Sequence, residues 1–287
     1  MVRFGPSGND EQFYSDGYSK TIDAFAWVKK LGLELFEYSL GNGITLKPET
    51  AKLMGIEAQK QGIEVSVHAP YFINFANESA EARQKSINYV VNSLKLLDAF
   101  DGKKLVVHSG TTLGKPRNEA LKILYEGYDA LLNEIYKQNL NNFFICPETM
   151  GKYSQIGSYE EIVDLCKLDK CLIPTFDFGH INCVMQGGLK TEDDFKKIID
   201  YAMDNLGEFK TNSLHIHFSK IAYTDKGELK HLDLSSTEFG PDFEKLARVI
   251  KEYNLNPTVI CESKGKMATD ALILKNIYYN LGGENKC

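Results

Sequence analysis

The sequence predicts a (β/α)8 TIM barrel, formed as a single domain by residues 1–287. Eight short apolar runs alternate with eight segments in which apolar residues recur at three- and four-residue spacing, the pattern of amphipathic helices. A chain of 287 residues has the length of one such barrel. The alternative α/β fold is a doubly wound sheet. Its nucleotide-binding form has no support, because the sequence has no G-x-G-x-x-G motif after the first run and no P-loop.

The predicted strands are short and apolar, as barrel strands are. The clearest is LIPTF, residues 172–176, which reads as a buried strand and ends at Asp177. In chain order the eight strands are residues 2–7, 33–40, 64–70, 104–110, 143–149, 172–179, 214–219 and 258–263.

A helix-like segment follows each predicted strand, and Gly or Asn often closes it, as at a helix C-cap. The segments TIDAFAWVKKLG and PETAKLMGIEAQKQG, for example, close with Gly32 and Gly62. The connection at residues 218–241, after the seventh strand, is long and is expected to be a loop. The eight predicted helices are residues 21–32, 48–62, 88–100, 120–137, 159–166, 193–206, 242–254 and 271–281.

The composition is that of a soluble globular protein, with 43% hydrophobic and 25% charged residues. We expect a cytoplasmic monomer with no membrane partner, because no apolar run reaches the roughly 18 residues of a membrane span and the N-terminus has no apolar signal core. The six cysteines show no C-x-x-C spacing and are expected to be free, buried thiols. The net charge of −6 argues against broad, nonspecific coating of nucleic acid.

Side chains that bind metal ions recur at the carboxyl ends of the predicted strands three to eight. In a barrel these ends meet at one mouth, where active sites lie. All six histidines of the chain belong to this set, and histidine with carboxylate is a ligand set for zinc or manganese. The sequence therefore predicts a site for one, two or three ions. The set comprises His68, His108, Glu148, Asp177, His180, His215, His217, His231 and Glu262.

Each of these residues also has a structural interpretation when it is taken alone. Asp177 can cap the segment that follows it, and Glu148 and Glu262 can pair with Lys152 and Lys264. Taken together, several buried charges at the same strand ends must be compensated, and bound cations do so. We therefore interpret the set as a metal site.

The order and spacing of these residues resemble the endonuclease IV family, whose members are TIM barrels that use three zinc ions to cut DNA at abasic sites. The resemblance covers about residues 60–265. It rests on the motifs HAPYFINFAN (68–77), VVHSG (106–110), PETMG (147–151), DFGH (177–180) and LHIHFSK (214–220).

The resemblance implies a role for each residue. Glu148 would bridge two zinc ions and act on the water that attacks the phosphate. Tyr71 and Phe72 match the position at which the family inserts side chains into DNA, so the implied partner is DNA that contains an abasic site. The other ligands would be His68 and His108 on the first zinc, Asp177, His215 and Glu262 on the second, and His180 and His231 on the third.

The chain departs from the family pattern at two places. The family's third zinc takes an Asp two residues before the loop histidine, but Leu229 stands two residues before His231. Alternative ligands for the third ion are Glu228, Asp233 and His217. We expect this third ion to bind more weakly than the other two. The family's loop after the second strand is long and carries an arginine that enters the DNA, whereas SLGNGITLKPE, residues 39–49, is short and has none.

Two enzymatic functions follow as hypotheses. The first is a zinc-dependent phosphodiesterase of the endonuclease IV type, which cleaves DNA 5′ to abasic sites in base excision repair, with a metal-bridging hydroxide as nucleophile; manganese is possible in place of zinc. The second is a sugar isomerase or epimerase of the xylose isomerase-like kind, with one ion on strands five to eight. A third, non-enzymatic hypothesis is a barrel that binds metal and recognises DNA without cutting it.

The two enzymatic hypotheses differ in the number of ligands they need. A sugar enzyme would use Glu148, Asp177, His215 and Glu262 only, so the remaining histidines favour a multinuclear site. Several cations near the predicted mouth can also meet phosphates, although for most of them the simpler interpretation is a solvated loop charge. These cations are Lys115, Arg117, Lys152, Lys220, Lys264 and Lys266.

Overall fold

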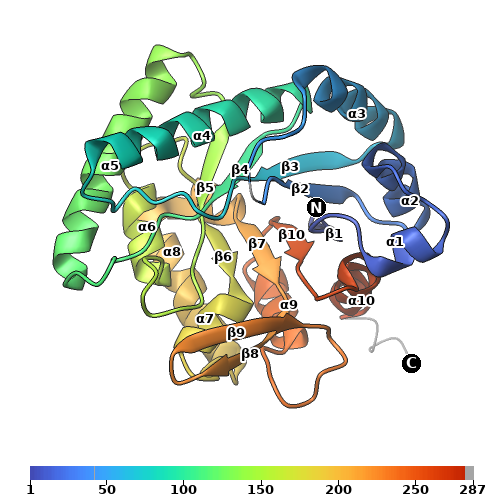
Figure 1. Cartoon of the computed structure of the whole chain (residues 1–287). Helices are drawn as coiled ribbons and strands as arrows, with labels where there is room; N and C mark the ends of the chain where they lie inside the picture. Colours follow the sequence, from blue (N-terminus) through green and yellow to red (C-terminus); the bar gives the residue numbers. More distant parts are fainter. Residues whose placement is uncertain (42, 282–287) are drawn as a thin grey trace.

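The computed structural model describes residues 1–41 and 43–281 and confirms the predicted barrel (Figure 1). Its parallel strands form two four-stranded sheets, ordered β2-β3-β4-β5 and β1-β10-β7-β6. Bridges from Ser7 to Glu37 and from Glu148 to Thr175 join the sheets on either side and close the ring. In the described part of the chain the barrel strands are β1 (Arg3–Pro6), β2 (Leu35–Ser39), β3 (Glu64–His68), β4 (Lys104–Val107), β5 (Phe144–Pro147), β6 (Thr175–Asp177), β7 (His215–Phe218) and β10 (Thr258–Cys261).

Helices surround the strands, and each predicted helix is present, some with longer bounds. Two short helices, α1 and α7, were not predicted, because neither is long enough to show a periodic pattern. A short 3-10 turn, Thr21–Asp23, precedes α2. The helices are α1 (Glu11–Ser15), α2 (Ala24–Lys30), α3 (Pro48–Gln61), α4 (Ala80–Ala99), α5 (Arg117–Lys137), α6 (Tyr159–Cys166), α7 (Phe178–Val184), α8 (Glu192–Asn212), α9 (Phe243–Glu252) and α10 (Met267–Asn280).

The long connection after β7 is a β-hairpin rather than a loop, so this prediction was wrong. Strands β8 (Lys220–Thr224) and β9 (Gly227–Leu232) pair antiparallel and lie beside α7 (Figure 1). The hairpin is fixed to the segment after β5, since the backbone N–H of Glu228 donates to the carbonyl of Gly151 at 2.8 Å. Gly227 makes this approach possible: its φ is 98°, and a Cβ there would lie 2.3 Å from the same carbonyl oxygen.

The cysteines agree with the expected free, buried thiols. Those in the described ranges 1–41 and 43–281 are free and buried, and Cys287 lies outside those ranges. None of the described helices is long and apolar enough to cross a membrane. Four of these five cysteines lie in strands or helices of the core, and Cys171 is buried in the turn before β6.

Candidate metal centre

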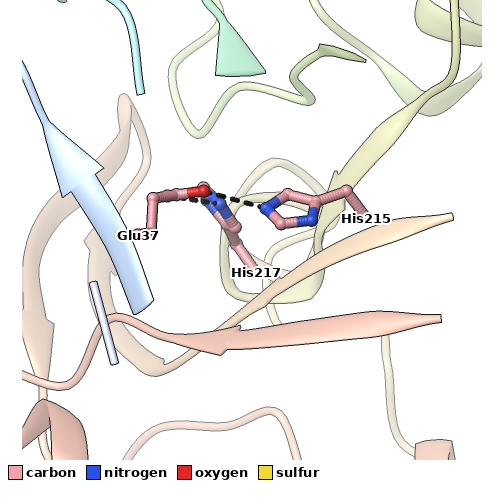
Figure 2. Close-up of side chains that lie close together, drawn as sticks. All are labelled: Glu37, His215 and His217. Carbon is pink, nitrogen blue, oxygen red and sulfur yellow. Dashed lines mark hydrogen bonds and ion pairs between the residues drawn. The ribbon is translucent and has the colours of Figure 1, made fainter. Parts of the chain in front are cut away.

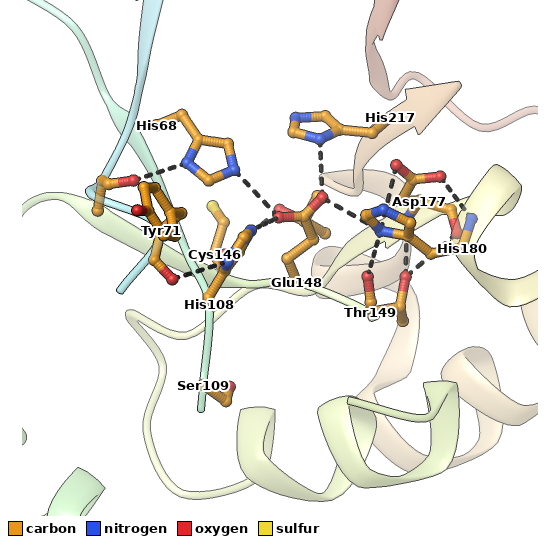
Figure 3. A network of polar contacts seen from close by, with 12 residues as sticks. His68, Tyr71, His108, Ser109, Cys146, Glu148, Thr149, Asp177, His180 and His217 are labelled. Atoms are coloured by element: carbon orange, nitrogen blue, oxygen red, sulfur yellow. Dashed lines mark hydrogen bonds and ion pairs between the residues drawn. The ribbon is translucent and has the colours of Figure 1, made fainter. Parts of the chain in front are cut away.

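Glu148 lies at the centre of the mouth of the barrel, directly after β5. Its Oε2 is 3.1 Å from Nε2 of His68 and 3.0 Å from Nε2 of His108. Its Oε1 is 3.0 Å from Nδ1 of His217 (Figure 3). The two oxygens of one carboxylate therefore face different sets of histidines, which is the arrangement that a ligand shared between two ions needs.

We call Glu148, Asp177, His217 and Glu262 the inner cluster. One ligand atom from each lies within 4.8 Å of the others, and the four residues follow or end β5, β6, β7 and β10. Oδ2 of Asp177 is buried and lies 3.3 Å from Nδ1 of His180, but it accepts no aligned hydrogen bond among the described residues. A buried carboxylate oxygen without a donor is costly unless a cation meets it, so this atom and the mixed nitrogen and oxygen donors fit a zinc or manganese ion.

His68 and His108 form a second group of ligands with Glu148. Nδ1 of His68 donates to the carbonyl of Ala69 at 2.8 Å, and Nδ1 of His108 donates to that of Tyr71 at 3.3 Å. A carbonyl oxygen only accepts, so both rings carry their proton on Nδ1 when neutral and present a free Nε2 toward Glu148. The two Nε2 atoms and the carboxylate of Glu148 are thus placed so that they could hold one ion.

We call His180, Glu228 and His231 the outer cluster. Oε2 of Glu228 is 3.6 Å from Nε2 of His180, and its Oε1 is 3.6 Å from Nε2 of His231. Of the three alternatives to the family's aspartate, Glu228 is the one that the fold brings to this place. Asp233 instead pairs with Lys266 at 2.9 Å.

A β-bulge explains how Glu228 reaches a position that the spacing in the sequence does not suggest. In the β8–β9 ladder Ala222 pairs with Lys230 and Tyr223 pairs with Glu228, so Leu229 is an extra residue without a partner. An extra residue shifts the alternation of faces by one, which places Glu228 on the side of His231. The side chain of Leu229 is 63% exposed.

The structure places His217, and not His215, beside Asp177 and Glu262. Asp177 pairs in register with His217, whereas His215 lies two residues further down β7, level with Thr175. The imidazole of His215 contacts Glu37 at 2.9 Å from Nε2 to Oε2 (Figure 2). His217, rather than His215, is therefore the strand-seven histidine that could share an ion with Asp177 and Glu262, because strand register decides which inward side chain reaches the mouth.

Glu37 is the residue that sequence reasoning missed. It lies in β2, is fully buried, and contacts both His215 and His217 (Figure 2). The available signal was a glutamate between two aromatic residues, Phe36 and Tyr38, of a predicted strand. A buried carboxylate must have partners, so this pattern could have pointed to inward-facing cations or hydrogen-bond donors.

The electrostatics of the inner cluster favour ionised carboxylates around cationic histidines. Burial alone would raise the pKa of Glu148, but the charge of His217 and hydrogen bonds from His108 and His217 hold it well below its ordinary value. Burial would likewise raise the pKa of Glu262, but His217 lowers it to about 2. The pKa of Asp177 is raised to about 6 by burial. The carboxylates in turn raise the pKa of His217 well above its ordinary value against the effect of burial, and a metal ion bound at this residue would release its proton.

The mouth forms a cavity of about 260 Å³ above the clusters, and it includes His68, Glu148, His180, His231 and Glu262 in its lining. The predicted DNA-contacting side chains lie at its rim and are exposed, Tyr71 at 60% and Phe72 at 42%. The six nearby cations differ in their partners. Lys115, Arg117 and Lys266 pair with Glu78, Glu161 and Asp233, and Lys220 donates to the carbonyl of Ser236. Lys152 and Lys264 are exposed.

Parallel strands closed into a barrel, with histidines and carboxylates gathered at their carboxyl ends, define this protein as a TIM barrel with a candidate metal centre. The chain belongs to the xylose isomerase-like TIM barrel family, whose model matches residues 25–277.

Proteins similar in sequence to this chain include an uncharacterized protein and a probable endonuclease. An uncharacterized protein of Methanocaldococcus jannaschii is 29% identical over 98% of this chain and 98% of its own length. A probable endonuclease 4 of Staphylococcus carnosus is 30% identical, but the match covers 58% of this chain and 56% of the relative. The chain thus spans little more than half the length of that endonuclease.

Solved structures of two kinds share the fold. A D-tagatose 3-epimerase-like protein superposes with a TM-score of 0.74 at 18% identity, covering 99% of both chains. Endonuclease IV from Thermus thermophilus superposes with a TM-score of 0.65 at 16% identity, covering 92% of this chain and 94% of the other. At these identities the likeness concerns the fold, and it does not separate a nuclease from a sugar enzyme.

Proposed function

We propose that this protein is a metal-dependent phosphodiesterase that cleaves DNA 5′ to abasic sites. The observation that carries the proposal is the position of Glu148. One of its oxygens faces His68 and His108, and the other faces His217 of the inner cluster. A single-ion enzyme has no need of the first two histidines, whereas a multinuclear centre requires ligands on both sides of a shared carboxylate.

The residues would divide the work of phosphodiester hydrolysis among them. Ions bound in the clusters would supply a water that is acidic enough to attack at neutral pH, and positive charge for the phosphate and the leaving oxygen. Glu148, held ionised by its histidines, would orient the attacking water and accept its proton. Tyr71 and Phe72, exposed at the rim, would insert beside the lesion and stack on the neighbouring bases.

The charge of the chain indicates how DNA would be held. With a net charge of −6, attraction for phosphates has to come from the mouth itself. Lys152 and Lys264 are exposed, and bound ions would add positive charge at the same place. We therefore expect few phosphate contacts and a weak dependence of affinity on salt.

A ketose isomerase or epimerase is the second candidate, and two observations favour it. The inner cluster by itself is a complete four-ligand site for one ion. The cavity of about 260 Å³ is also of a size for a small molecule rather than a duplex. In this hypothesis Glu148 and Glu262 would hold the ion, and His68 and His108 would have no part in the chemistry.

His108 separates the two candidates, because it lies outside the inner cluster. The experiment compares the wild type with His108→Ala on two substrates: an oligonucleotide with one tetrahydrofuran abasic analogue, and a panel of free ketoses. We expect the wild type to nick the oligonucleotide 5′ to the analogue, leaving a 3′-hydroxyl, and to convert no ketose. His108→Ala should lower nicking by about 100-fold or more.

Elemental analysis of the wild type and of His108→Ala, both purified without chelators, gives the number of ions bound per chain. The nuclease hypothesis expects two or three ions per chain in the wild type and fewer in His108→Ala. One ion per chain, with ketose conversion that survives in the variant, would overturn the proposal in favour of the sugar enzyme.

A further inference from the structure

A chain of buried hydrogen bonds runs from the bottom of the barrel to the inner cluster. Nζ of Lys104 is 2.8 Å from Oγ1 of Thr258, which is 2.7 Å from Nδ1 of His215. Nε2 of His215 is 2.9 Å from Oε2 of Glu37. We call Lys104, Thr258, His215 and Glu37 the relay; all four are buried, and they come from four different strands.

Each hydrogen bond of the relay has a determined direction. Burial lowers the pKa of Lys104 to about 8, so this group is an ammonium at neutral pH and only donates. Its other partners, at 2.8 Å and 3.4 Å, are the carbonyls of Ser213 and Leu214, which only accept. Oε2 of Glu37 only accepts, so Nε2 of His215 carries a hydrogen and donates to it. In the neutral ring Nδ1 of His215 then accepts from the hydroxyl of Thr258, which in turn accepts from the lysine.

The two carboxylate oxygens of Glu37 have different partners, and only one of them faces His217. Its Oε2 accepts from His215 and also from Oγ of Ser66 at 2.8 Å. Its Oε1 lies 3.0 Å from Nε2 of His217 (Figure 2). These two facing atoms are buried and have no aligned hydrogen-bond partner among the described residues. A carboxylate oxygen only accepts, so the nitrogen that faces it has to carry a hydrogen.

His217 differs from the other candidate ligands in how its proton is placed. His68, His108 and His180 each direct Nδ1 at a main-chain carbonyl, which fixes the ligand atom as Nε2. Both nitrogens of His217 face carboxylates instead: Nε2 faces Glu37, and Nδ1 faces Glu148 at 3.0 Å. A proton on Nδ1 would prevent that atom from binding an ion. Whether the neutral ring carries its proton toward Glu37 or toward Glu148 therefore decides whether Nδ1 of His217 can be a ligand.

We propose that the relay fixes the tautomer of His217, with the proton on Nε2 toward Glu37 and a free Nδ1 as the ligand atom of the inner cluster. Glu37 is then a positioning residue, because it acts on the ion through His217. The inference rests on the metal-binding part of the proposed function and is independent of the substrate.

Glu37→Gln tests the proposal because the relay also dictates how the new amide is oriented. The amide oxygen has to take the place of Oε2, since His215 donates there, and the amide NH2 then faces His217. Nε2 of His217 becomes an acceptor, and its proton moves to Nδ1. We expect the affinity of the inner ion to fall by about 10- to 100-fold, measured by competition with a zinc-chelating dye.

Long-range ¹H–¹⁵N correlation spectra of zinc-loaded, histidine-labelled protein give a direct readout of the tautomer. In the wild type His217 should show a protonated Nε2 and a coordinated Nδ1, and in Glu37→Gln this pattern should be lost. Ser66→Ala is the matched control, since it removes a hydrogen bond to the same oxygen but leaves the relay direction unchanged. It should keep the wild-type pattern and an affinity within about threefold of the wild type.

Glu37→Asp provides a second test if Glu37→Gln does not fold. The shorter side chain withdraws its carboxylate from Nε2 of His217, so His217 can carry its proton on either nitrogen, and zinc affinity should fall, but by less than in Glu37→Gln. Unchanged zinc affinity in a folded Glu37→Gln variant would overturn the proposal. The proposal would also be overturned if the wild type bound an additional ion that both Glu37→Gln and His215→Asn lose. Glu37 would then be a ligand itself. All readouts use zinc alone, so a protein that nicks no DNA can still confirm or refute the relay.

Discussion

The inner and outer clusters contain the same kinds of side chain but are built in different ways. Inner-cluster residues lie at the ends of four barrel strands, and Glu148, Asp177 and His217 are almost completely buried. In the outer cluster Glu228 and His231 come from the β8–β9 hairpin, and their side chains are 18% and 27% exposed. Strand pairing around the whole ring fixes the inner positions, whereas one bulge and the contact with Gly151 fix Glu228.

This difference indicates how the two clusters will hold ions. A barrel strand cannot move without breaking its ladders on both sides, so the inner ligands are preorganised. A hairpin at the rim opens at a lower cost in free energy, because fewer buried contacts hold it. We therefore expect the inner ion to bind tightly and the outer ion to exchange. Five variants test this contrast, and we expect their effects to decrease from Glu148→Gln to Leu229→Asp.

Glu148→Gln should have the largest effect, because this residue touches the ligands on both sides of the centre. We expect the loss of at least one ion and a fall in nicking of about 10²- to 10⁴-fold, with the barrel still folded. Elemental analysis, an oligonucleotide assay and circular dichroism measure the three quantities. Glu119→Gln, an exposed change on α5, is the control. Full activity of Glu148→Gln would refute a multinuclear centre.

Gly151→Ala should disable the outer cluster while leaving the inner cluster loaded. A Cβ at this position would lie 2.8 Å from both Cβ of Glu228 and Cδ2 of His180, so the hairpin has to shift. We expect one ion fewer per chain and nicking reduced by roughly 10- to 100-fold. The loss of all ions would show that the clusters are not independent.

His231→Ala removes one outer ligand without crowding the hairpin, so its effect should be smaller than that of Gly151→Ala. We expect it to lose the outer ion only. Mild dialysis of the wild type against chelator should remove the same ion first, leaving a protein with the metal content of the variant. Equal resistance of all ions to dialysis would remove the proposed contrast between the clusters.

Tyr71→Ala changes the rim and neither cluster. Metal content should stay at the wild-type value, while kcat/KM for the abasic oligonucleotide falls by about tenfold, as expected from the loss of one stacking contact. Tyr136→Ala, which removes another exposed aromatic ring from the end of α5, is the control. An unchanged kcat/KM would mean that Tyr71 does not contact the substrate.

Leu229→Asp restores the sequence spacing of the endonuclease IV family and should have the smallest effect. The bulge turns this side chain toward solvent, so the new carboxylate points away from His231. We expect the affinity of the outer ion to change by less than about twofold. A clear gain in affinity would show that residue 229, and not Glu228, faces the ion.

The barrel and most of the residues at its mouth can be predicted from the amino-acid sequence alone. Alternating strand and helix periods predict the eight βα units, and a parallel barrel brings all strand ends together whatever the details of packing. His68, His108, Glu148 and Asp177 could be found in this way, because each ends a predicted strand.

Tertiary packing determines which of these side chains lie close enough together to share an ion. The places of His217, Glu37 and Glu228 depend on strand register and on a single bulged residue, and neither leaves a mark in hydrophobic periodicity. Because side chains alternate along a strand, a shift of one residue moves a ligand to the other face, and a shift of two moves it along the barrel axis. The sequence specifies these shifts only through the pairing of all the strands at once.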